Sequence, residues 1–226
     1  RLGARFTRHV YASFPQSIAG ARPMALPLRH SLATLDRADA RAAARSHFGL
    51  GQDSRVLLVF GGSQGAQRLN AVVAAALPAL RAQGIDVLHA YGSRNDPPAP
   101  SPGYVAVPFI ERMDLAYAAA DIALTRAGAM TCAELAAVGL PAIYVPLPIG
   151  NGEQRLNALP VVSAGGGLIR EDGDLTAEWL VETVASVLHD EGRLLAMEAA
   201  ASRHGVRDAD DLLAGAVLQA ATGGRG

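Results

Sequence analysis

The stretch Arg55-Val-Leu-Leu-Val-Phe-Gly-Gly-Ser-Gln-Gly-Ala66 decides the fold of this chain. Its first six residues are almost all apolar, which predicts a strand that is buried on both faces. A glycine-containing turn follows at residues 61–66, and an alanine-rich segment with helical spacing comes after it. A strand, a tight turn and a helix in this order are typical of a parallel sheet covered by helices.

The same alternation continues along the chain and predicts an α/β fold, a Rossmann-like parallel sheet with helices on both faces. The expected strands are residues 55–60, 85–90, 104–107, 121–125, 142–145 and 167–169. The expected helices are residues 36–47, 70–82, 113–120, 129–138 and 154–164. Beyond Thr176 the pattern is helical, with breaks near Asp190 and Gly205.

The composition limits the classes of function. The 226 residues are half hydrophobic and carry a formal charge of -1, so the overall charge gives no reason to expect nucleic-acid binding. The one cysteine, Cys132, cannot form an intramolecular disulfide or a cysteine metal cluster, which favours a reducing, cytoplasmic compartment. The longest apolar stretch, residues 135–150, is interrupted by glycine and proline, so we expect no membrane-spanning helix.

The two ends of the chain differ from its middle. Residues 1–30 combine short apolar pieces with loop-forming prolines and glycines, and we expect them to be the tail of a preceding domain and a linker. Residues 31–221 are expected to form the main domain, and residues 222–226 a disordered tail. Because the chain starts at Arg1 in the middle of structured-looking sequence, we expect a fragment of a longer protein.

The turn at residues 61–66 is a candidate phosphate site. Backbone N–H groups at a glycine turn before a helix attract anions, and Ser63 adds a hydroxyl donor. The turn lacks the Gly-x-Gly-x-x-Gly pattern of dinucleotide-binding proteins and the Lys-Ser/Thr of a P-loop. A tight turn that merely requires small residues is the alternative.

A second turn, at residues 126–128, repeats this arrangement, since a strand precedes it and a helix follows it. In open α/β sheets ligands bind beyond the carboxyl ends of the strands, where both turns are expected. Glu134 lies in the early turns of the second helix and can reach back toward this cleft, where a carboxylate suits paired ribose hydroxyls. The alternative is a glutamate that only balances the helix dipole.

A third loop, residues 146–157, is rich in proline and glycine and ends in amide side chains. Gln154 and Asn157 are three residues apart and share a helix face, so together they offer donors and acceptors to sugar hydroxyls. The alternative is ordinary polar capping of a surface helix.

Taken together, these motifs resemble the MurG family of peptidoglycan N-acetylglucosaminyltransferases, and the third loop resembles that of actinobacterial members. The resemblance extends over essentially the whole chain and implies the carboxy-terminal, donor-binding half of a glycosyltransferase B fold. It rests on Gly-Gly-Ser-Gln-Gly-Ala at residues 61–66, Phe109-Ile110, Arg126-Ala-Gly-Ala-Met-Thr131, Glu134 and Gly150-Asn-Gly-Glu-Gln-Arg-Leu-Asn157, in this order.

The resemblance implies roles for particular residues. Ser63 would contact the diphosphate, Ile110 would bind the uracil through its backbone, and Glu134 would bind the ribose. Phe109 would lie beside the base, the amides of the third loop would bind GlcNAc hydroxyls, and Arg29 would lie at the interdomain edge. The expected substrate-binding residues are Arg29, Ser63, Phe109, Ile110, Ala129, Met130, Thr131, Cys132, Ala133, Glu134, Gln154 and Asn157. At Ala25, Ala127 and Glu153 the chain departs from residues common in relatives.

For an intact enzyme the resemblance implies inverting transfer of GlcNAc from UDP-GlcNAc to the MurNAc C4 hydroxyl of lipid I, which gives lipid II. The amino-terminal domain, with the general base, the lipid acceptor site and the membrane-facing patch, is almost wholly missing here. We therefore expect the fragment to bind UDP-GlcNAc without transferring the sugar. No cofactor and no metal are expected, and the expected location is the cytoplasm, at the inner face of the membrane.

Other functions stay open. Another UDP-sugar glycosyltransferase B or a UDP-GlcNAc 2-epimerase shares the two-domain plan and a ribose-binding glutamate, and a noncatalytic nucleotide-binding module is a third reading. A dinucleotide oxidoreductase is disfavoured because its glycine fingerprint is missing. Trp179 and Met197 are interpreted as packing residues, and residues 171–174 as a solvated acidic turn rather than a metal site. None of the six histidines is assigned to catalysis.

Overall fold

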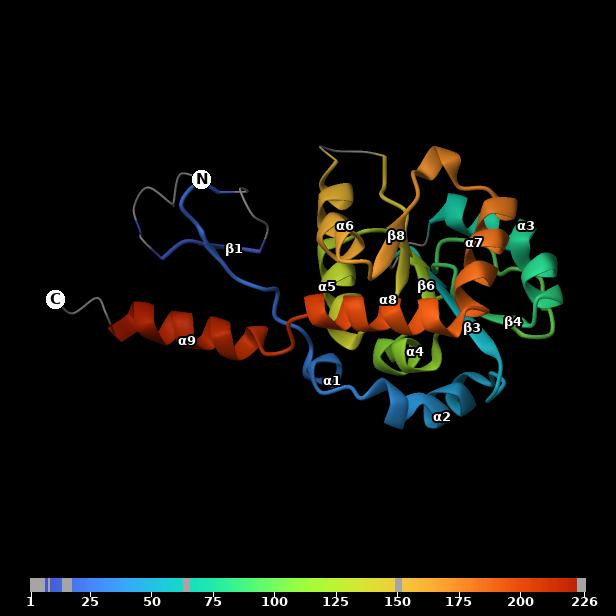
Figure 1. The fold of residues 1–226 in the computed structure, drawn as a ribbon, viewed down its shortest axis with the longest axis horizontal. Coiled ribbons are helices and arrows are strands. Elements are labelled where there is room, and N and C mark those ends of the chain that lie inside the picture. Colours follow the sequence, from blue (N-terminus) through green and yellow to red (C-terminus); the bar gives the residue numbers. More distant parts are fainter. Residues whose placement is uncertain (1–6, 8, 14–17, 63–65, 149–151, 223–226) are drawn as a thin grey trace.

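The centre of the molecule is a parallel sheet (Figure 1). The computed structural model describes residues 7, 9–13, 18–62, 66–148 and 152–222. The sheet has six strands in the order β5-β4-β3-β6-β7-β8, and all neighbouring pairs are parallel. Its strands are β3 (Arg55–Phe60), β4 (Ile85–Ala90), β5 (Tyr104–Val107), β6 (Ile122–Thr125), β7 (Ala142–Tyr144) and β8 (Gly167–Ile169).

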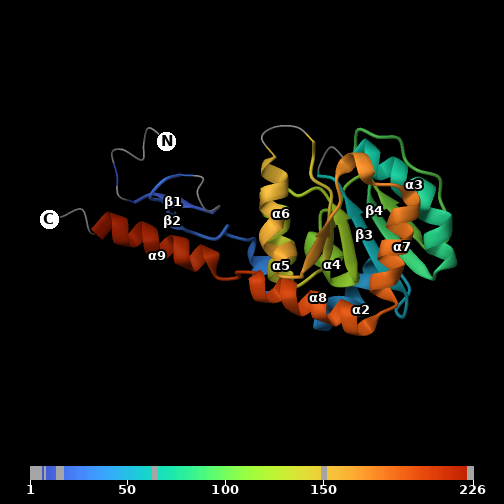
Figure 2. The same ribbon diagram turned by 45° about the horizontal axis from the view of Figure 1, so that its top comes forward.

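Helices cover both faces of this sheet, as Figures 1 and 2 show. Alternate residues of β3 point to opposite sides, so Val56 and Leu58 enter one apolar cluster while Leu57 and Val59 enter the other. The first cluster is covered by α2 (Arg37–Phe48), α4 (Met113–Ala119), α5 (Ala129–Val138) and α6 (Glu153–Ser163). The second is covered by α3 (Gln67–Ala82), α7 (Ala177–Leu188) and part of α8 (Glu191–His204).

The predicted α/β class and all six strands of the main sheet are confirmed, with small shifts of the boundaries. The helix expected from residue 70 begins at Gln67, because the fully buried Leu69 already packs on the sheet. The strand expected from Asp121 begins at Ile122. The helical breaks near Asp190 and Gly205 are confirmed, and Met197 is buried as expected of a packing residue.

The two ends of the described chain lie side by side, away from the sheet (Figures 1 and 2). The segment expected to be a linker contains a short parallel pair, β1 (Tyr11–Ala12) and β2 (Arg22–Pro23), and is followed by α1 (His30–Ala33). At the other end, α9 (Ala209–Thr222) includes Thr222, so the predicted tail was placed one residue too early. Residues 223–226 lie outside the described residues.

Candidate functional site

The candidate site lies at one edge of the sheet. Because all six strands are parallel, the loops that follow β3, β5, β6 and β7 emerge at the same edge. These are the loops in which the sequence places the predicted binding residues. Ser63 lies outside the described residues, so its contact with the diphosphate stays a prediction. Of this turn, the structure describes Gly61, Gly62 and Ala66.

Glu134 occupies the second turn of α5 and is buried, with 9% of its side chain exposed. Its Oε2 accepts a hydrogen bond of 2.8 Å from the hydroxyl of Tyr117 on α4. Burial, followed by the neighbouring charge of Glu134, raises the pKa of Tyr117 well above its usual value. Tyr117 therefore stays protonated and donates to the carboxylate, a partnership that the sequence did not indicate.

Arg29 approaches the same carboxylate. It precedes α1, its side chain is 65% exposed, and its Nη2 lies 4.0 Å from Oε1 of Glu134. Two predicted residues that are about a hundred positions apart in the sequence are thus brought together. Because the Arg29 side chain is exposed and lies 4.0 Å from the carboxylate, the pair contributes little to stability, and the guanidinium can also face an anionic ligand.

Gln154 and Asn157 hold loops together. Oε1 of Gln154 accepts hydrogen bonds from the backbone N–H groups of Ala127 at 3.1 Å and of Leu147 at 3.0 Å. Nδ2 of Asn157 donates to the carbonyl of Ala127 at 3.0 Å. Within the described residues, the N–H donors of Gln154 and the side-chain oxygen of Asn157 have no partner, so each side chain can offer half of its predicted hydrogen-bonding capacity to a ligand.

The loop after β5 places its two predicted residues in opposite environments. Phe109 is 55% exposed, whereas Ile110 is 4% exposed and belongs to the first apolar cluster. An exposed aromatic ring next to a residue anchored in the core is suited to stacking against a flat ligand, because the anchor fixes the backbone beside the ring.

The start of α5 supplies the remaining predicted residues. Met130 is exposed, Ala129, Thr131 and Ala133 are half-buried, and Cys132 is buried. Burial raises the pKa of Cys132 to about 12, so the thiol is neutral near pH 7. Cys132 is therefore a packing residue rather than a nucleophile.

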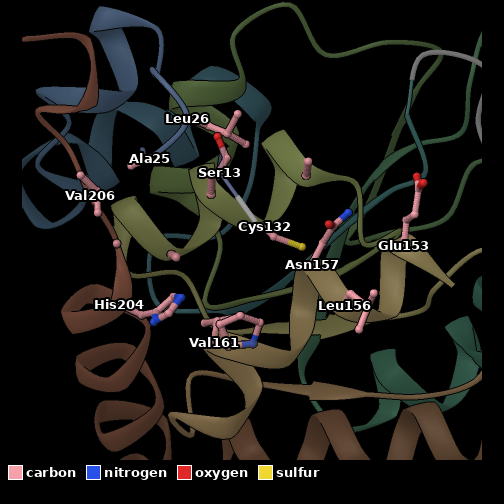
Figure 3. Close-up of a pocket in the computed structure, with 15 residues that line it drawn as sticks. Ser13, Ala25, Leu26, Cys132, Glu153, Leu156, Asn157, Val161, His204 and Val206 are labelled. Carbon is pink, nitrogen blue, oxygen red and sulfur yellow. The ribbon is translucent and has the colours of Figure 1, made fainter. Parts of the chain in front are cut away.

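A cavity of about 990 Å³ opens beside this site, between the segment that precedes α1, the helices α5 and α6, and the end of α8 (Figure 3). Four predicted residues line it: Ala129, Cys132, Ala133 and Asn157. Among the described residues that line the cavity, neither Phe109 nor Glu134 occurs. The cavity thus adjoins Asn157 and the start of α5 and does not extend to Phe109 or Glu134.

Glu171, Gly173 and Asp174 are exposed, as expected of a solvated turn, but Asp172 is an exception. The side chain of Asp172 is 15% exposed and forms ion pairs with Arg126 at 2.5 Å and Arg68 at 3.5 Å. It thereby ties the loop after β6 to the first turn of α3. In the described part of the chain, no group of three or more His, Cys, Asp or Glu side chains is placed to hold a metal ion.

Comparisons with known proteins identify the family of this chain. The model of the glycosyltransferase family 28 C-terminal domain matches residues 56–213. The UDP-N-acetylglucosamine--N-acetylmuramyl-(pentapeptide) pyrophosphoryl-undecaprenol N-acetylglucosamine transferase of Streptomyces avermitilis is 57% identical over 226 residues, which are 97% of this chain and 62% of that protein. The protein of the same name from Mycolicibacterium smegmatis is 55% identical over 100% of this chain and 60% of its own length.

Two solved glycosyltransferase structures are also similar to this chain. The crystal structure of MurG from Acinetobacter baumannii is similar with a TM-score of 0.68 and 27% identity, over 88% of this chain and 57% of that chain. The calicheamicin glycosyltransferase CalG4 is similar with a TM-score of 0.54 and 26% identity, over 72% of this chain and 42% of that one. This chain spans about three fifths of the length of the curated relatives that it matches. Since the family model covers well over half of its residues, the chain belongs to the glycosyltransferase family 28 C-terminal domain family.

Proposed function

We propose that this chain is the UDP-GlcNAc-binding part of an inverting N-acetylglucosaminyltransferase that converts lipid I to lipid II in peptidoglycan synthesis. The observation that carries the proposal is the buried carboxylate of Glu134 in the helix that follows β6, where the carboxylate is held by the Tyr117 hydroxyl and has Arg29 beside it. The similarity to the Streptomyces avermitilis transferase supports the identity of the donor and the acceptor.

The proposed donor lies along this edge. The uracil packs beside Phe109 and bonds the backbone of Ile110, and the ribose hydroxyls donate to Glu134. The diphosphate lies near Ser63 and the N-termini of α3 and α5, where partial positive charge accumulates. The GlcNAc reaches the N–H groups of Gln154 and the carbonyl oxygen of Asn157.

The proposed chemistry is an in-line displacement, in which the MurNAc C4 hydroxyl attacks the anomeric carbon and UDP departs. The helix N-termini stabilise the charge that develops on the leaving diphosphate, because their dipoles are already oriented toward it. The general base and the lipid acceptor site are assigned to an amino-terminal domain, of which residues 1–30 are the tail, while residues 31–221 form the donor domain. The amino-terminal domain is proposed to contact the cytoplasmic face of the membrane. No helix among the described residues has the length and apolarity that crossing a bilayer requires.

Calorimetric titration of the purified chain with UDP-GlcNAc, UDP-GalNAc and NAD tests the donor assignment. We expect UDP-GlcNAc to bind most tightly and NAD not to bind, and we expect Glu134→Ala to weaken UDP-GlcNAc binding. Equal binding of all three ligands, or binding of none, would contradict the proposal. Tighter binding of another UDP-sugar would instead favour a different glycosyltransferase B.

A second measurement tests the division of labour. The chain alone is expected to give negligible lipid II when incubated with UDP-GlcNAc and lipid I, because the base is assigned to another domain. Synthesis of lipid II by this chain would refute that assignment while leaving the donor site intact.

A further inference from the structure

Three hydrogen-bonded polar side chains, two of them buried and one half-buried, connect β5, β4 and α3. The connection starts at Tyr104 on β5, continues through His89 on β4 and ends at Asn70 in the first turns of α3. The Tyr104 hydroxyl lies 2.7 Å from Nδ1 of His89, and Nε2 of His89 lies 3.0 Å from Oδ1 of Asn70. His89 is 1% exposed and Tyr104 is buried, so their contact is shielded from solvent, whereas Asn70 is half-buried.

The direction of each hydrogen bond follows from the last one. Nδ2 of Asn70 donates to the carbonyl of Tyr91 at 2.9 Å, so its Oδ1 is the atom that faces His89 and accepts from Nε2–H. Nδ1 of His89 is then left as an acceptor, which matches the hydroxyl of Tyr104. Burial lowers the pKa of His89 to about 4 and raises that of Tyr104 to about 12, so both groups are neutral near pH 7.

Tyr91, whose carbonyl accepts a hydrogen bond from Asn70, is in turn hydrogen-bonded to the segment that leads to Phe109. The N–H of Tyr91 donates to the carbonyl of Val107 at 3.0 Å, and the N–H of Gly92 donates to the carbonyl of Pro108 at 3.0 Å. Pro108 immediately precedes Phe109. A path of hydrogen bonds thus connects the first turn of α3, through Asn70 and Tyr91, to the backbone beside Phe109.

We propose that Asn70 is a positioning residue for the donor nucleotide, which holds the start of α3 and the loop before Phe109 at a fixed separation, while His89 orients the Asn70 amide. The inference rests on the proposed function, in which these two places contact the diphosphate and the base. Neither Asn70 nor His89 belongs to the predicted binding set, and neither is assigned a contact with the ligand. Their effect is to keep two subsites in register, so that one nucleotide reaches both without a cost for reorganising the loops.

The polar character of the path supports this role over simple packing. Apolar side chains of the same size would fill the space between α3 and β4 without fixing how the helix slides along the strand. The hydrogen bonds of Asn70 favour one arrangement, because a shift of α3 breaks them and leaves Nε2 of the buried His89 unpaired.

The test compares whole and divided ligands in three forms of the protein. The affinities of UDP, of uridine and of pyrophosphate are measured by calorimetry or ligand-observed NMR for the wild type, Asn70→Leu and Tyr104→Phe. Asn70→Leu removes the donor to the Tyr91 carbonyl without adding a charge near the proposed diphosphate subsite, so it cuts the path to the loop before Phe109. Tyr104→Phe removes the buried hydroxyl that faces His89 but leaves the bond from Asn70 to Tyr91 in place, so it is the matched control for loss of stability.

We expect Asn70→Leu to weaken UDP binding about tenfold while the affinities of uridine and of pyrophosphate change less than twofold. Tyr104→Phe is expected to lower the melting temperature and leave all three affinities unchanged. Unchanged UDP binding by Asn70→Leu, or an equal loss for all three ligands, would overturn the positioning role. If the wild type fails to bind UDP, the donor site itself is refuted, and this inference with it.

A second measurement does not depend on a variant that folds. In the wild type, pyrophosphate alone is expected to slow amide hydrogen exchange at Tyr91 and Gly92, because a ligand at the start of α3 tightens the path that leads to them. Slower exchange confined to α3 would overturn the coupling.

Discussion

Two buried carboxylates at opposite edges of the sheet have very different surroundings. Asp121 lies just before β6, at the amino edge, with 3% of its side chain exposed. It accepts hydrogen bonds from the N–H of Val56 at 2.7 Å and from Arg45 at 3.1 Å, and it forms a further pair with Arg41. Glu134, at the carboxyl edge, receives the Tyr117 hydroxyl at 2.8 Å and has Arg29 at 4.0 Å.

The different numbers of partners indicate that Asp121 serves stability and that Glu134 is suited to binding. A carboxylate has about four acceptor positions, and in the described part of the chain those of Asp121 are largely filled, while those of Glu134 are not. Burying a charge is costly unless other groups compensate it. The carboxylate of Asp121 therefore stabilises the fold. The carboxylate of Glu134 has acceptor positions that the hydroxyl groups of a ligand can fill.

Substitution of Asp121 should give the largest effect. Asp121→Asn leaves the buried guanidinium of Arg45 without its charge partner, so we expect the free energy of unfolding to fall by about 3–5 kcal/mol. Urea denaturation measures the change. Glu171→Gln, which removes an exposed ion pair with Arg155, is the matched control and should cost less than about 1 kcal/mol. Equal effects of the two substitutions would contradict the contrast between the edges.

Acidification should destabilise the fold through His89. Its pKa is lowered from 6.5 to about 4 by burial, so the unfolded chain binds a proton more readily than the folded chain. The contribution is complete above pH 6.5 and is lost as the pH falls toward 4, by roughly 3 kcal/mol in total. NMR titration of the His89 ring measures this pKa directly. A midpoint near 6.5 would show that the ring is not buried as a neutral acceptor.

Glu134 should affect binding more than folding. Glu134→Gln removes the charge that the ribose hydroxyls are proposed to meet but keeps an oxygen for Tyr117, so we expect UDP-GlcNAc affinity to fall about 10–100-fold. The melting temperature should change little. Calorimetry and thermal denaturation measure the two quantities, and Glu171→Gln controls for the loss of one negative charge. If the variant loses stability but its folded fraction binds UDP-GlcNAc with normal affinity, Glu134 has a structural role like that of Asp121.

The sequence predicts local structure well because its signals are local. The near-continuous apolar run of β3 and the glycine turn after it identify a parallel strand without reference to any other part of the chain. The helix start at Ala129 follows from the adjacent glycine in the same way. The predicted set also brings together Arg29 and Glu134, although the resemblance and not the residue pattern indicated that pair.

The sequence could not show which residues are already engaged by others. Tyr117 lies in an alanine-rich helix that gives no sign of contact with Glu134. Asp172 belongs to a run that is typical of a solvated turn, and its pairing with Arg126 becomes visible only when β6 and the segment after β8 are placed together. The hydrogen bonds from backbone N–H groups to Gln154 likewise connect two loops whose separation depends on the whole sheet.

Substitution of Gln154 should give the smallest effect. Its side-chain oxygen holds two loops together, and its N–H groups are proposed to bind the sugar. Gln154→Glu keeps oxygen acceptors for the N–H groups of Ala127 and Leu147 but removes the amide donors, so folding should be preserved. We expect UDP-GlcNAc affinity to fall roughly threefold, less than a full hydrogen bond because water can replace the donor, while UDP affinity stays unchanged. Gln154→Met removes the acceptor as well and should also lower the free energy of unfolding by about 1–2 kcal/mol. If both variants weaken UDP and UDP-GlcNAc equally, Gln154 only holds the loops together, and the sugar-binding role at this edge passes to Asn157.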